Sequence, residues 1–197
     1  MKKYNCTLCM SGSRSLIFSI GNVLLGVKKH SPSLFDRVVV YTDKLPDNDI
    51  IALKKIFDFI EIVEYTPKFN SYLSAMYSDP TNQGARLPCP VYADFEIFNL
   101  IKKSKHVVYL DSDILIKKDI SSLLNYGSLA MRKISTKLDD ALGVSDPKLS
   151  KLDFYNSGII VLNDKVNYSH LADECYKIAQ EYAKTNAYCD QSVLVGI

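Results

Sequence analysis

Two carboxylates separated by a single residue, Asp111 and Asp113, follow directly after an apolar stretch at residues 107–110. This stretch reads Val-Val-Tyr-Leu and is typical of a strand buried in a sheet. In an extended chain, side chains two positions apart lie on the same side, so we expect Asp111 and Asp113 to project together while Ser112 points away. Carboxylates suit Mg²⁺ or Mn²⁺, and such cations are commonly bound by one or two carboxylates together with substrate phosphates. The sequence therefore predicts a divalent cation at this position and a phosphorylated substrate.

Two further polar segments follow later in the chain, Asn156-Ser157-Gly158 and Asp190-Gln191. An asparagine offers both a donor and an acceptor to hydroxyl groups, and a glycine permits close approach of the backbone. Each segment also has an ordinary structural interpretation. Asn-Ser-Gly is common in turns between strands, and Asp190 could cap the start of a helix.

The first part of the chain alternates strand and helix patterns. Residues 4–10, 38–41 and 59–65 read as strands, while residues 13–29 and a stretch opening at Pro46 carry apolar residues at helical spacing. The predicted order is β-α-β-α-β, which is typical of a mostly parallel sheet covered by helices on both faces.

The second part begins with a polar stretch at residues 66–90 that is rich in Pro, Asn and Ser. Such a stretch is either a functional lid or substrate-shaping loop, or a variable surface excursion. A helix at residues 91–104 then leads into the strand that ends before Asp111, which places the carboxylates where α/β sheets bind ligands. The remaining patterns predict a short helix capped by Asp119, strands at 128–134 and 154–162, a helix at 167–185, and no clear helix over residues 190–197.

Composition narrows the class of protein. A chain of 197 residues with 47% hydrophobic and 23% charged residues, without repeats or linkers, predicts one globular α/β domain spanning residues 1–197. Because 24 basic residues nearly balance 22 acidic ones, no overall field favours nucleic acid or a membrane surface. Neither a secretory signal nor a transmembrane stretch is evident, and five irregularly spaced cysteines suit a reducing compartment. The sequence thus predicts a cytoplasmic protein without a nucleic-acid partner.

Three motifs in a fixed order carry a family resemblance. Residues 107–116 read Val-Val-Tyr-Leu-Asp-Ser-Asp-Ile-Leu-Ile, residues 156–163 read Asn-Ser-Gly-Ile-Ile-Val-Leu-Asn, and Asp190-Gln191 follows. With this order and spacing the chain resembles the family-8 glycosyltransferases, the group that includes glycogenin and bacterial lipopolysaccharide galactosyl- and glucosyltransferases.

The resemblance implies the GT-A architecture, a single Rossmann-like nucleotide-binding domain with a central, mostly parallel but mixed sheet flanked by helices. It further implies a nucleoside diphosphate sugar donor of the UDP-glucose or UDP-galactose type, a Mn²⁺ or Mg²⁺ cofactor, and hexose transfer with retention to a glycan, lipid-linked or protein acceptor. A cation held by Asp111 and Asp113 would stabilise the charge that develops on the leaving diphosphate. Asp113 is the stronger candidate for direct coordination.

Further site residues follow from the same resemblance. The catalytic pair would be Asp190 and Gln191, which would face the anomeric centre. The donor sugar or acceptor would contact Asn156, Ser157, Gly158 and Arg86. The nucleotide would lie against Cys9, Met10, Ser11, Ser13, Asp111 and Ser112.

The chain departs from the family pattern at three places. Ser11-Gly12-Ser13 stands where the family commonly has Asp and Asn residues, and Asp94 stands where it often has an arginine, for which Arg86 could substitute. The later family segment His-x-x-Gly-x-x-Lys-Pro-Trp, which supplies a third metal ligand, does not occur. The sequence therefore predicts a fragment or a minimal form with weaker metal and donor binding.

Two alternative functions remain compatible with these residues. One is a non-catalytic relative that binds sugar nucleotide or glycan without turnover. The other takes Asp111 and Asp113 as nucleophile and acid of a haloacid-dehalogenase-like phosphatase. The second is less favoured, because that motif usually opens its domain, whereas here several β-α units precede it.

Overall fold

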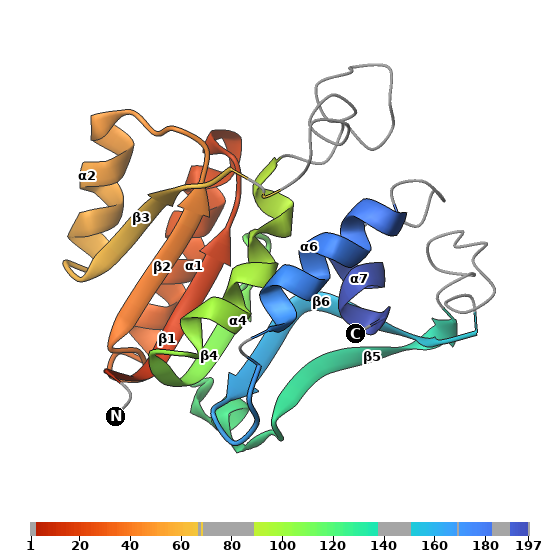
Figure 1. The fold of residues 1–197 in the computed structure, drawn as a ribbon. Coiled ribbons are helices and arrows are strands. Elements are labelled where there is room, and N and C mark those ends of the chain that lie inside the picture. Colours follow the sequence, from red (N-terminus) through yellow and green to blue (C-terminus); the bar gives the residue numbers. More distant parts are fainter. Residues whose placement is uncertain are drawn as a thin grey trace.

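The computed structural model describes residues 3–66, 68, 89–137, 151–168, 170–182 and 190–196. Within them, six strands form one mixed sheet in the order β3-β2-β1-β4-β6-β5 (Figure 1). The strands are β1 (Tyr4–Ser11), β2 (Arg37–Thr42), β3 (Ile60–Glu64), β4 (Ser104–Leu110), β5 (Leu129–Lys137) and β6 (Asp153–Asn163). Strands β1 to β4 run parallel, whereas β6 is antiparallel to β4 and β5 is antiparallel to β6. This arrangement confirms the mostly parallel, mixed sheet.

The helical elements are η1 (Arg14–Leu16), α1 (Ile17–His30), α2 (Asp47–Ile56), η3 (Cys89–Glu96), α4 (Ile97–Leu100), η4 (Ser121–Asn125), α6 (Leu171–Tyr182) and α7 (Asp190–Gly196). The predicted β-α-β-α-β order is confirmed by β1, α1, β2, α2 and β3. All six residues of β2 are buried, as expected for a parallel strand covered on both faces.

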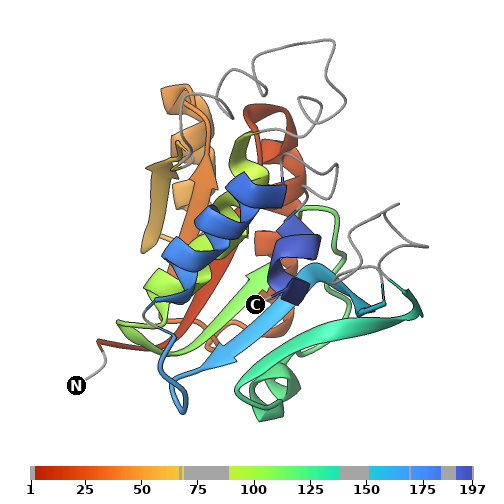
Figure 2. The ribbon, with the colours of Figure 1, turned by 45° about the vertical axis from the view of Figure 1, so that its right-hand side comes forward.

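Side chains alternate along the central strands between two apolar layers. In β4, Val108 and Leu110 pack on the side of α1 and α2, while Val107 and Tyr109 pack on the side of η3, α4, α6 and α7. The turned view shows α6 and α7 lying in front of the sheet, with α1 behind it (Figure 2). None of the helices in the described ranges combines the length and apolarity needed to cross a membrane.

The strand order reverses between β1 and β4. From β1 the chain builds outward through β2 and β3, and β4 then pairs with the other edge of β1. In α/β sheets, ligands bind outside the carboxyl ends of the strands at such a switch point. Asp111 follows the last residue of β4, so the predicted carboxylate motif lies beside this point.

Two helix predictions were wrong. Residues 91–104 do not form one long helix, because a 3₁₀ segment, η3, is followed by the short α4, and β4 starts at Ser104. Tyr92, Phe95 and Phe98 are all buried, and their spacing of three suits a 3₁₀ winding that keeps all three against the sheet. The other error concerns residues 190–197, where α7 occurs because Val193 and Leu194 pack into the core.

Candidate functional site

Asp111 is fixed to β6 through its backbone. Its N–H donates to the carbonyl oxygen of Gly158 at 2.9 Å, and its side chain is half-buried. Because β4 ends at Leu110, Ser112 and Asp113 lie in a turn, so the extended alternation expected for the triplet was wrong. The exposed Asp113 nevertheless lies near enough for its charge to act on Asp111.

The environment of Asp111 disfavours its charged form. Burial raises the pKa of Asp111 to about 6, a hydrogen bond from Tyr109 lowers it, and the charges of Asp190 and Asp113 raise it. A nearby cation stabilises the charged form of a carboxylate that is partly buried close to two other carboxylates. The electrostatics therefore fit the predicted cation position.

Gly158 lies close to two polar side chains of the site, while its predicted contact with the sugar stays a prediction. A Cβ atom at this position would lie 2.8 Å from Oδ2 of Asp111 and 2.9 Å from Oδ1 of Asn156. The Asn156 oxygen also accepts a hydrogen bond from the Gly158 N–H at 3.1 Å. Because residues 156–158 lie inside β6, the alternative interpretation as a turn between strands is wrong.

Asp190 is the first residue of α7 and is 6% exposed. Ser157 donates its hydroxyl to Oδ2 of Asp190 at 2.7 Å, which joins β6 to α7. Burial raises the pKa of Asp190, and the hydrogen bond from Ser157 lowers it. Next to it, the side-chain oxygen of Gln191 is buried and has no hydrogen-bond partner within the described part of the chain. Asp190 is thus both the start of a helix and a member of the carboxyl cluster that it forms with Asp111 and Asp94.

Asp94 lies in the site, although from the sequence it was noted only as the residue that stands where the family often has an arginine. It lies in η3, is 1% exposed, and neither of its carboxyl oxygens accepts a hydrogen bond of ordinary geometry from the described residues. Burial raises its pKa well above the usual range, and the neighbouring Asp190 and Asp111 raise it further. The available signal was an acidic residue among Tyr92, Ala93 and Phe95 in an otherwise apolar run.

The carboxyl end of β1 lies beside this cluster. The Ser11 hydroxyl is hydrogen-bonded to the Tyr109 hydroxyl at 2.7 Å, and Ser13 is hydrogen-bonded to Ser15. The side chains of Cys9 and Met10 are completely buried in the two core layers, so they are not available to a nucleotide at this edge.

Two more predicted residues remain. Ser112 is half-buried in the turn after Asp111. Arg86 lies outside the described residues.

The metal prediction can be tested against the donor set. Within the described ranges, no group of three or more His, Cys, Asp or Glu side chains is arranged to hold a metal ion. Two carboxylates supply part of the coordination shell of Mg²⁺ or Mn²⁺, and diphosphate oxygens and water commonly supply the rest. Asp111 and Asp113 therefore fit a cation that is bound together with a nucleotide.

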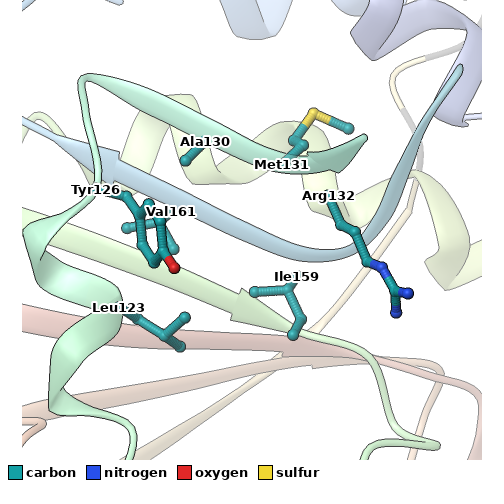
Figure 3. Close-up of a pocket in the computed structure, with 7 residues that line it drawn as sticks. All are labelled: Leu123, Tyr126, Ala130, Met131, Arg132, Ile159 and Val161. Carbon is teal, nitrogen blue, oxygen red and sulfur yellow. The ribbon is translucent and has the colours of Figure 1, made fainter. Parts of the chain in front are cut away.

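An apolar pocket of about 280 Å³ lies on the other face of β6 from α7. Its lining consists of Leu123, Tyr126, Ala130, Met131, Arg132, Ile159 and Val161 (Figure 3). Arg132 is the one charged residue of this lining, and its guanidinium points away from the Tyr126 and Leu123 side chains. The pocket is thus distinct from the carboxyl cluster, although Ile159 directly follows Gly158.

Comparison with known proteins decides the family. Residues 5–197 match the sequence profile of glycosyl transferase family 8. The chain belongs to glycosyl transferase family 8. This match covers nearly the whole chain and confirms the resemblance that the three motifs carried. No protein of curated function matches the sequence.

Solved structures similar to this family-8 chain show the same fold. The galactosyltransferase LgtC, in complex with donor and acceptor sugar analogs, superposes with a TM-score of 0.71 at 16% identity, covering 96% of this chain and 69% of LgtC. The glycosyltransferase GlyE in Streptococcus pneumoniae TIGR4 gives 0.60 at 14% identity, covering 98% of this chain and 43% of GlyE. Core-mannan synthase A from Aspergillus fumigatus, in its Mn/GDP form, gives 0.56 at 10% identity, covering 97% and 68%. The predicted GT-A architecture is confirmed.

Proposed function

We propose that this glycosyltransferase transfers a hexose from a UDP sugar to a glycan, lipid-linked or protein acceptor, with retention at the anomeric carbon and with Mn²⁺ or Mg²⁺ bound by Asp111 and Asp113. One observation carries the proposal. Beyond the carboxyl end of β4, the backbone of β6 holds Asp111, and Ser157 of β6 holds Asp190 of α7. Three segments far apart in the sequence thus bring carboxylates and hydroxyl-binding groups to the switch point of the sheet.

The cation, when bound, supplies Lewis-acid stabilisation of the leaving diphosphate. Residues of the chain itself position the carboxylate that would bind this cation. The absence of a side chain at Gly158 leaves room for the Asp111 carboxylate, and the Asp111 N–H bond to Gly158 fixes its backbone. Transfer breaks the bond between the anomeric carbon and the diphosphate oxygen and forms a bond to the acceptor oxygen, whose proton is released.

Asp190 and Gln191 are proposed to face the donor sugar. A carboxylate held by Ser157 stabilises positive charge that develops on the sugar ring as the glycosidic bond breaks. The Gln191 side-chain oxygen is buried without a partner in the described part of the chain, so it can accept a hydrogen bond from a sugar hydroxyl. Asn156 lies in β6, two residues before Gly158, where its amide can contact the same sugar.

LgtC was solved with donor and acceptor sugar analogs, and core-mannan synthase A with Mn and GDP. These neighbours support a nucleotide sugar and a metal for the present chain, and the UDP donor itself is part of the proposal.

A thermal-shift experiment tests this function. We expect UDP-glucose or UDP-galactose to raise the melting temperature when Mn²⁺ is present and to have little effect without it, because a ligand that binds only the folded state stabilises it in proportion to occupancy. At a hundredfold excess over Kd the stabilisation is about 2.7 kcal/mol. Asp113→Ala should abolish the Mn²⁺-dependent shift.

The matched control is Asp58→Ala, at an exposed aspartate just before the amino end of β3, at the opposite end of the sheet. It should shift as the wild type does. Equal shifts with and without Mn²⁺, or a full shift in Asp113→Ala, would contradict the proposal. Release of free hexose from the UDP sugar then separates a transferase from a relative that only binds.

A further inference from the structure

The apolar pocket between η4 and the β5–β6 pair has no role in the function proposed above. Its volume is about 280 Å³. Tyr126 in its lining is 59% exposed, and Leu123, Ala130 and Ile159 are half-buried, so apolar surface faces solvent here. An open apolar concavity with a single charged residue in its lining is typical of a ligand site.

One end of this pocket lies next to the candidate site. Ile159 is paired with Leu110, the last residue of β4. Figure 3 shows Arg132 and Ile159 at one end of the pocket and Tyr126 at the other. The end with Arg132 is therefore the end at the carboxyl edge of β4, where the carboxyl cluster begins.

A bulge in β6 brings Arg132 beside the predicted sugar-binding segment. Met131 lies opposite Ile160, but the next residue, Arg132, lies opposite Asn156, so residues 157–159 bulge out of the pairing. Bulges are frequent next to functional sites, where they redirect side chains. Along the β5–β6 pair, the apolar lining is thus followed by a guanidinium and then by the amide of Asn156.

The guanidinium of Arg132 is available to an anionic ligand. Its side chain is exposed, and the ion pairs formed by the described residues do not include it. By contrast, its neighbours Lys133 and Lys137 are both paired with Asp153. A guanidinium presents parallel N–H donors that match the oxygen atoms of a phosphate or a carboxylate.

We propose that this pocket is an acceptor subsite, which binds a glycan joined through a phosphate diester to a hydrocarbon chain. The chain lies against Leu123, Ala130 and Ile159, and the phosphate is bound by Arg132. This inference deepens the function proposed above and rests on it for the transfer step, whereas binding of the chain and the phosphate can be tested alone.

The order of groups in the pocket selects this acceptor chemistry. Apolar lining, guanidinium and Asn156 follow one another in the order hydrocarbon chain, phosphate and sugar. The anion must therefore join the chain to the glycan. A phosphate that joins two alcohols keeps one negative charge, whereas a carboxyl group loses its charge when it forms an ester, so the junction is a phosphate.

Calorimetric titration of the whole chain with octyl phosphate, octanol and inorganic phosphate tests this subsite without UDP sugar or Mn²⁺. The two octyl compounds are kept below the concentrations at which they form micelles. Octyl phosphate should bind saturably and about tenfold more tightly than octanol, because the hydrogen bonds from Arg132 are charge-assisted. Inorganic phosphate should show no saturable binding, because it makes no apolar contacts.

Three variants separate the contributions. Arg132→Met should lose the tenfold preference for octyl phosphate over octanol. Lys133→Met is the matched control, because it removes the same charge from the next residue of β5, and it should bind as the wild type does. Ala130→Phe fills the pocket and should weaken both octyl compounds. Since Arg132 is exposed, the comparison of Arg132→Met with Lys133→Met holds even if Ala130→Phe does not fold.

NMR spectra of labelled methyl groups locate the bound octyl chain. The methyl groups of Ala130 and Ile159 should shift when octyl phosphate is added. A second apolar pocket, of about 250 Å³, lies on the α7 side of the β5–β6 pair and includes Leu194. Shifts at Leu194 in place of Ala130 and Ile159 would overturn the assignment.

Other results would also overturn it. These are no saturable binding of octyl phosphate, equal affinities in the wild type and Arg132→Met, or an equal loss in Lys133→Met. If octyl phosphate does not bind and sedimentation shows a dimer that Ala130→Phe dissociates, the pocket is an interface between two copies of the chain.

Failure of this inference is distinct from failure of the proposed function. If the wild type binds octyl phosphate as expected but binds no UDP sugar with Mn²⁺, the proposed donor is wrong and the phosphate-binding pocket stands. If UDP sugars bind with Mn²⁺ but octyl phosphate does not, the donor stands and the acceptor subsite is overturned.

Discussion

Replacing Gly158 by alanine should weaken binding of the cation while it lowers the stability of the folded protein only slightly. The added Cβ would lie 2.8 Å from Oδ2 of Asp111 and 2.9 Å from Oδ1 of Asn156, which is too short for a carbon–oxygen contact. Both obstructing atoms are the ends of side chains, so we expect the Asp111 carboxylate to rotate away while its backbone bond to Gly158 at 2.9 Å persists.

The size of both effects follows from this geometry. Overpacking of a well-packed site costs about 1–3 kcal/mol, and relief by side-chain rotation places Gly158→Ala near the low end, at about 1 kcal/mol of unfolding free energy. A similar loss of about 1 kcal/mol at the cation site lowers affinity by about fivefold, because each 1.4 kcal/mol is a factor of ten in Kd. The folded protein should therefore survive, while Mn²⁺ and UDP bind weakly.

Urea unfolding gives the stability change, and calorimetric titration with Mn²⁺ and UDP gives the change in affinity. Gly127→Ala is the matched control, because no atom lies within 4 Å of the added Cβ there. It should leave both quantities unchanged. If Gly158→Ala binds Mn²⁺ and UDP as the wild type does, the link between Gly158 and the Asp111 carboxylate is refuted.

Two other predictions concern Ser157 and the pH dependence of stability. Ser157→Ala removes the buried 2.7 Å hydrogen bond to Asp190, so urea unfolding should show a loss of about 1–3 kcal/mol and hexose release should slow; an unchanged rate would exclude Ser157 from orienting Asp190. The pKa of Asp111 is raised by burial from 3.8 to about 6 in the folded protein, so the stability that its protonation contributes is present below about pH 4 and lost as the pH rises through about 6. Urea unfolding of metal-free protein from pH 4 to 7 should therefore show a smaller fall in Asp111→Asn than in the wild type, and parallel curves would contradict this.

The sequence predicted the elements that apolar runs define directly. The Val-rich runs at residues 38–40 and 107–108 occur in strands covered on both faces, and that burial leaves few alternatives. Asp111 could be placed at the carboxyl end of a strand for the same reason. The three motifs were sufficient to predict the family and its GT-A fold, because their order and spacing reflect the same sheet.

What the sequence could not show depends on contacts between distant segments. Asp94 is a site residue because η3 and α7 meet, and no local pattern encodes that contact. The helix α7 has only seven residues and is stabilised by packing of Val193 and Leu194, so its own sequence signal is weak. The aromatic spacing of three in η3 resembles an α-helical pattern, which explains why residues 91–104 were predicted as one helix.

The pairing of Asp111 and Asp113 was predicted correctly in one respect and wrongly in another. Their carboxylates lie near each other, as the spacing suggested, but they do so through a turn after Leu110 rather than through an extended strand. Motif spacing predicted that the two charges are neighbours. The backbone geometry that makes them neighbours follows from where β4 stops pairing with β6. The last residue of β4 in this pairing is Leu110, which lies opposite Ile159.

The most direct test of the central claim is an anomalous difference map from crystals soaked with Mn²⁺ and UDP. The account predicts a manganese peak within coordination distance of the carboxylates of Asp111 and Asp113, with the diphosphate of UDP bound to the same ion. A peak elsewhere, or UDP bound with no manganese at these two aspartates, would contradict it.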